Sequence, residues 1–127
     1  MIRISSGAAI ELQDRIIQET GGSYGLRDEG LLESVLEAPF ATFAGVDLFH
    51  TVEEKAARLG YGLVANHAFL DGNKRVGVLV MLAFAKVNGL RLEYTDEDIV
   101  WLGFGMADGS LAYEDYLAWI RGAQKAE

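Results

Sequence analysis

The segment that most constrains the fold is a run of ten residues without a polar side chain, from residue 76 to residue 85 of 127. A helix that is apolar on every face belongs in the middle of a fold, covered by other elements. A bilayer span needs about 20 such residues, so the run is too short to cross a membrane. We therefore predict a buried central helix over residues 73–88, closed by Gly89.

A compact polar segment, HAFLDGNKR at residues 67–75, leads into this run. At the N-terminus of a helix, free backbone N–H groups and the positive end of the dipole favour an anion. Gly72 lets the backbone approach a ligand closely, and Lys74 and Arg75 add positive charge. We predict an anion site at this helix start, formed by Gly72, Asn73, Lys74 and Arg75.

The same segment carries a carboxylate and an imidazole. Asp71 offers oxygen to a hard cation such as Mg²⁺, and His67 is the nearby side chain that can accept a proton. Plainer interpretations stay open at this point. Asp71 or Asn73 could be a helix N-cap, and the side chain of Asn73 could orient the loop or bind a phosphate. Lys74 and Arg75 could be solvated charges, and a single histidine is more often structural than catalytic.

The segment resembles the signature of the Fic/Doc family, H-x-F-x-(D/E)-G-N-(G/K)-R-x-x-R, from His67 through Arg75. Lys74 at the variable position is similar to the death-on-curing (Doc) branch, whose members are toxins of toxin–antitoxin pairs. The last arginine of the longer signature falls on Val78, so the second phosphate-binding arginine is absent. Weaker similarity covers residues 25–34, 51–57 and 88–89.

The resemblance implies an all-α fold: one Fic/Doc-type domain over residues 1–127, with about six helices around the central one and the motif loop at its N-terminus. It also implies a toxin that transfers a phosphoryl group from ATP, or another nucleoside triphosphate, to a hydroxyl side chain of a target protein. His67 is then the general base, Asp71 holds Mg²⁺, and Gly72, Asn73, Lys74 and Arg75 hold the phosphates.

Three classes of function remain in view. Nucleotidyl-transferring Fic proteins have glycine and arginine where this chain has Lys74 and Val78, so phosphoryl transfer is the first expectation and protein adenylylation the alternative. A nucleotide-binding module that has lost catalysis is the second class. An interaction partner that binds another chain through its acidic surface is the third, and it is compatible with the first.

Partners follow from the resemblance too. An antitoxin is expected to hold the protein inactive through a disordered segment that folds as a helix in a groove, which the sequence does not locate. A translation elongation factor is the expected target, so activity should arrest growth. Residues 40–50 are a candidate flap that docks the target as an added strand.

Composition sets further expectations. A net charge of −8 argues against unaided nucleic-acid binding, because phosphates would be repelled. There are no cysteines, and the N-terminus has no apolar signal core, so we expect a cytoplasmic protein that uses no thiol chemistry.

Cap residues predict where the remaining helices begin. The expected N-caps are Ser5 or Ser6, Asp28, and Thr51 in a capping box with Glu54.

Residues 40–50 have no helical period, and we expect them to form a loop anchored by aromatic side chains. Arg27 is expected at the surface, His50 in a loop without a catalytic part, and Trp101 and Trp119 in the core. A turn is expected at residues 108–110 and a frayed end at residues 125–127.

Overall fold

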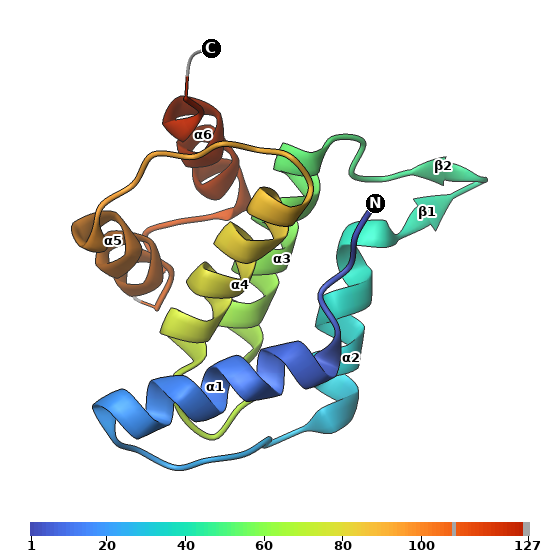
Figure 1. Cartoon of the computed structure of the whole chain (residues 1–127). Helices are drawn as coiled ribbons and strands as arrows, with labels where there is room; N and C mark the ends of the chain where they lie inside the picture. Colours follow the sequence, from blue (N-terminus) through green and yellow to red (C-terminus); the bar gives the residue numbers. More distant parts are fainter. Residues whose placement is uncertain (108, 126–127) are drawn as a thin grey trace.

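The structure, a computed structural model of the chain, describes residues 1–107 and 109–125. The turn expected at residues 108–110 and the fraying expected at residues 125–127 therefore lie partly outside the described residues. In chain order the elements are α1 (Ser6–Thr20), α2 (Glu29–Glu37), η1 (Ala38–Phe40), β1 (Thr42–Phe43), β2 (Val46–Asp47), α3 (Val52–Asn66), α4 (Asn73–Val87), α5 (Asp96–Ala107) and α6 (Tyr113–Ala123). Six α-helices and one small hairpin in this part of the chain confirm the predicted all-α fold (Figure 1).

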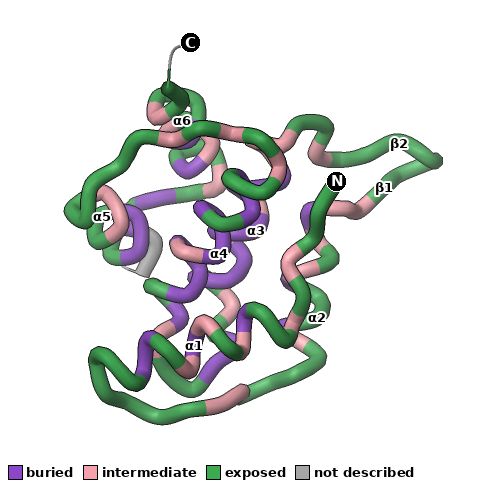
Figure 2. Tube along the Cα trace, in the orientation of Figure 1, coloured by how far each residue is buried: buried purple, intermediate pink, exposed green. Residues whose placement is uncertain are grey.

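The apolar run forms α4, which lies at the centre of the molecule and packs along α3 (Figure 2). Val78 and Phe84 are fully buried, and Leu82 is nearly so, as predicted. The two helices approach closely because Gly77 has no side chain: a Cβ there would lie 2.5 Å from Val64 Cγ2. The helix ends at Val87, one residue before the predicted end. Within the described residues, no helix is long and apolar enough to cross a membrane.

The predicted helix starts are confirmed by their caps. The side chain of Ser5 accepts from the N–H of Ala8, and that of Asp28 accepts from Leu31. Thr51 Oγ1 accepts from the N–H of Glu54 at the start of α3. These caps set the entry points of α1, α2 and α3, and α1 crosses the end of the α3–α4 pair where the motif loop lies (Figure 1).

Residues 40–50 differ from the expected loop. They form the end of η1 and a two-stranded antiparallel hairpin in which Phe43 pairs with Val46 (Figure 1). The side chain of Lys55, from α3, is buried and donates to the carbonyl of Phe49, which ties the base of the hairpin to the helical core. The strands themselves project from the molecule, and Phe43 is 76% exposed.

The expectation that Trp101 is a core residue is wrong. α5 buries Leu102, whose carbonyl accepts a hydrogen bond of 2.7 Å from the hydroxyl of Tyr116 in α6. Because α5 carries apolar residues on more than one face, only part of them reach the core. Trp101, Val100 and Phe104 are left more than half exposed. Trp119 is half-buried against the core, as expected.

Candidate active site

The predicted site residues sit in the loop between α3 and α4. His67 ends α3 in the left-handed conformation, with φ 52° and ψ 51°, which a residue with a side chain adopts rarely. This turn sends the chain away from the axis of α3, so that Phe69 is buried in the core. The side chain of His67 is exposed to solvent.

The side chain of Asn73 holds the loop in shape. Its Oδ1 accepts from the N–H of Phe69, and its Nδ2 donates to the carbonyl of Phe69, both over 2.9 Å. Asn73 is buried, at 9% exposure. The side chain of Asn73 thus orients the loop, which is one of the alternatives that the sequence left open.

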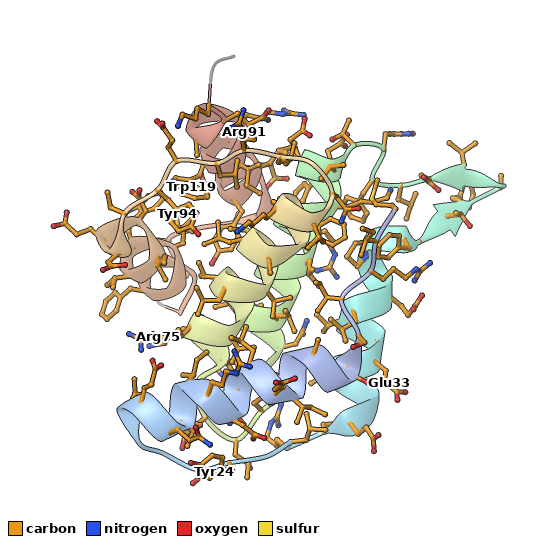
Figure 3. The ribbon with its side chains drawn as sticks, viewed as in Figure 1. Tyr24, Glu33, Arg75, Arg91, Tyr94 and Trp119 are labelled. Atoms are coloured by element: carbon orange, nitrogen blue, oxygen red, sulfur yellow. The ribbon has the colours of Figure 1, made fainter. Side chains whose placement is uncertain are left out.

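The N-terminus of α4 is open to an anion. Its N-cap is Gly72, in the left-handed conformation at φ 78°, and no side chain caps the helix. Neither Asp71 nor Asn73 is thus the N-cap. Lys74 and Arg75 follow in the first turn with exposed side chains, and Arg75 projects outward from the start of α4 (Figure 3).

All six predicted site residues line one pocket. Its volume is about 530 Å³, and its walls come from the motif loop and from α1. The lining residues are Ile16, Thr20, His67, Leu70, Asp71, Gly72, Asn73, Lys74 and Arg75. His50 is not among them. A proton acceptor, a carboxylate and a cationic helix start therefore face a shared space.

The Asp71 carboxylate lies at the edge of this pocket. Its Oδ2 accepts a hydrogen bond of 2.7 Å from the N–H of Ser23, in the segment after α1. Within the described residues, no group of three or more histidine, cysteine or acidic side chains could hold a metal ion. Mg²⁺ typically uses one or two carboxylates together with substrate phosphates and water. A single exposed carboxylate beside an anion site fits that mode.

Arg27 supports the site from the surface position that the sequence predicts for it. Its side chain is exposed as expected, and it also donates from Nε to the carbonyl of His67 over 2.7 Å and from Nη2 to that of Asn66 over 3.1 Å. The backbone N–H of Arg27 donates to the carbonyl of Ala68 over 2.8 Å. Arg27 therefore caps the C-terminus of α3 at the residue that carries the imidazole.

Comparison with known proteins identifies the family of this chain. The sequence profile described as "Fic/DOC family" matches residues 3–85. The chain belongs to the Fic/DOC family. Over 72 residues it is 42% identical to the "Toxin Doc" of Mycolicibacterium smegmatis, which covers 57% of this chain and 55% of that protein. Over 112 residues it is 29% identical to the "Protein kinase doc" of Escherichia phage P1, which covers 88% of this chain and 87% of that protein.

The Fic/DOC match contains the whole candidate site and ends within α4. Position 78, where the longer Fic/Doc signature has its last arginine, is occupied here by Val78, which is fully buried in the core. The positive side chains of the signature are therefore Lys74 and Arg75 at the start of α4, and position 78 carries no charge.

Proposed function

We propose that this Fic/DOC protein is the toxin of a toxin–antitoxin pair and that it transfers the terminal phosphoryl group of a nucleoside triphosphate to a hydroxyl side chain of a target protein. The observation that carries the proposal is that His67, Asp71 and the uncapped start of α4 line one pocket. The names of the two relatives, a toxin and a protein kinase, support the same proposal.

In this proposal His67 is the general base. The target hydroxyl attacks the terminal phosphorus, and the imidazole accepts the hydroxyl proton as the new O–P bond forms and the nucleoside diphosphate leaves. Such proton transfer typically contributes 10²–10⁴-fold. The exposure of His67 supports this role, because a side chain on another protein must be able to reach the imidazole.

The phosphates would lie on the start of α4. Backbone N–H groups of Gly72, Asn73 and Lys74 would donate to phosphate oxygens, and the side chains of Lys74 and Arg75 would offset their charge. Asp71 would hold Mg²⁺, and the ion would supply positive charge that offsets the charge of the phosphates. The pocket volume of about 530 Å³ is in the range typical of small-molecule sites.

Phosphoryl transfer is favoured over adenylylation by two residues. Nucleotidyl-transferring Fic proteins leave room for a diphosphate leaving group and neutralise it with a second arginine. Here Lys74 replaces the small glycine of those proteins, and its side chain lies against α5, with Nζ 5.3 Å from the ring centroid of Phe104. Val78 replaces their second arginine and is buried. A terminal phosphate is thus better accommodated at this loop than a diphosphate.

We propose that the target docks on the hairpin of β1 and β2. Phe43 and Val46 are 76% and 57% exposed, and a two-residue strand leaves backbone groups free to pair with an added strand. A translation elongation factor is the proposed target, on family resemblance.

We propose that the antitoxin segment binds the exposed face of α5. A pocket of about 530 Å³ there is lined by Val100, Trp101 and Phe104 together with Asp96 and Glu97. Apolar side chains beside carboxylates suit an amphipathic helix with basic residues at its edge. The net charge of −8 favours the approach of such a basic segment.

Labelled ATP tests the transferred group. The protein, Mg²⁺ and elongation factor are incubated with ATP labelled either at the γ-phosphate or at the α-phosphate. Label that reaches the target from γ alone supports the proposal. Label from the α-position supports adenylylation instead. Nucleotide binding without any transfer, in the presence of the target, would leave the silent nucleotide-binding module as the better description.

A further inference from the structure

Gln13 is a polar side chain at 0% exposure on the inner face of α1. Its amide makes three hydrogen bonds. Nε2 donates to the carbonyl of Ser23 over 3.1 Å and to that of Asp71 over 3.2 Å, and Oε1 accepts from the N–H of Gly25 over 3.3 Å. A buried amide costs free energy unless it is paired, and here all three bonds go to two loops of the candidate site.

These bonds control the segment that holds the Asp71 carboxylate. Ser23 is fixed through its carbonyl by Gln13, and its N–H donates to Asp71 Oδ2 over 2.7 Å. Gly22 also lies close to this carboxylate, since a Cβ there would lie 3.1 Å from Asp71 Oδ2. The carboxylate is therefore held at Oδ2, and Oδ1 makes no hydrogen bond within the described residues.

We infer that Gln13 is a positioning residue for Asp71: it fixes both the backbone and, through Ser23, the carboxylate of the residue that would hold Mg²⁺. This inference rests on the proposed function. Partners that orient a metal-ligating carboxylate set its affinity for the ion, and their loss typically costs 10–100-fold. An apolar residue at position 13 would fill the same space in the core but would leave Asp71 free to turn.

Nucleotide binding measures this role without activity. Calorimetry measures the dissociation constant of a non-hydrolysable ATP analogue once with Mg²⁺ and once without it. The ratio of the two constants gives the affinity gained from the metal. In Gln13→Met this gain should fall about 10-fold, while metal-free binding stays unchanged. Gln18→Met, at an exposed position on the same helix, should match the wild type.

A second variant keeps the test decisive if Gln13→Met does not fold. Gly22→Ala places a Cβ 3.1 Å from Asp71 Oδ2, so the carboxylate must shift, and it should also reduce the gain from Mg²⁺. Gly21→Ala is its control, because Gly21 also has a positive φ but has nothing within 4 Å of a Cβ. If Gln13→Met keeps the wild-type gain in affinity from Mg²⁺, or if Gly22→Ala keeps it where Gln13→Met does not fold, the inference is overturned and the proposed function stands. A wild type that gains nothing from Mg²⁺ overturns the metal role in the proposed function, and the inference with it.

Discussion

The guanidinium of Arg27 holds the backbone of His67, with Nε 2.7 Å from the His67 carbonyl oxygen. His67 sits in the left-handed conformation at the end of α3, where the last carbonyls of a helix lack partners of their own. A positive charge at a helix C-terminus is also favourable to the dipole. One side chain thus satisfies the helix end and fixes the direction from which the imidazole enters the pocket.

Removal of Arg27 should therefore slow the chemical step more than it weakens substrate binding. In Arg27→Met we expect kcat to fall about 10- to 100-fold with little change in KM for ATP, because small misplacements of a catalytic group are costly. Steady-state kinetics of phosphoryl transfer measures both constants. Arg91→Met, an exposed arginine that contacts no motif residue, is the control. A rise in KM at unchanged kcat would show that Arg27 binds substrate instead.

The crossing of α3 and α4 should not tolerate a methyl group. In Gly77→Ala the new Cβ would lie 2.5 Å from Val64 Cγ2 and 2.9 Å from the Val64 backbone nitrogen. We expect a loss of about 1–3 kcal/mol in the free energy of unfolding, despite the better helix propensity of alanine. Gly122→Ala in α6 meets nothing within 4 Å and should be neutral or stabilising by up to about 1 kcal/mol. Urea denaturation compares the two; equal effects would contradict the close crossing.

Tyr116 should make the fold sensitive to alkali. Burial raises the pKa of this phenol above its ordinary value of 10.0. The phenol of the unfolded chain therefore loses its proton at a lower pH than that of the folded chain. The contribution of Tyr116 to the free energy of unfolding is fully present below pH 10 and declines as the pH rises beyond it. Tyr116→Phe should be less stable at neutral pH, because the hydroxyl no longer donates to Leu102, and should lose less stability between pH 9 and pH 11. Parallel alkaline curves for the two proteins would argue against a buried phenol.

Much of the site was predictable because its chemistry is local in sequence. The residues from His67 to Arg75 are contiguous, and the apolar run that follows places them at a helix start. That the side chain of Asn73 orients the loop was among the alternatives that the sequence left open, and its bond to Phe69 spans only four residues. Contiguity of this kind needs no knowledge of the tertiary fold.

The supporting residues were not predictable for the opposite reason. Arg27 reaches His67 across 40 residues, and Gln13 reaches Asp71 across 58. No local spacing encodes either contact.

The prediction for Trp101 was wrong because α5 is apolar on several faces, so the periodicity of its sequence does not indicate which face packs against the core. The hairpin at residues 42–47 is too short for strand alternation to be recognised.

The intact mass of elongation factor after incubation with ATP and Mg²⁺ tests the central claim, that His67 is the base for phosphoryl transfer. The wild-type protein should add the mass of one phosphoryl group to the target. His67→Ala should add nothing while binding an ATP analogue like the wild type, and His50→Ala should behave as the wild type. A target that gains an adenylyl group, or one that His67→Ala modifies at a comparable rate, would contradict the account.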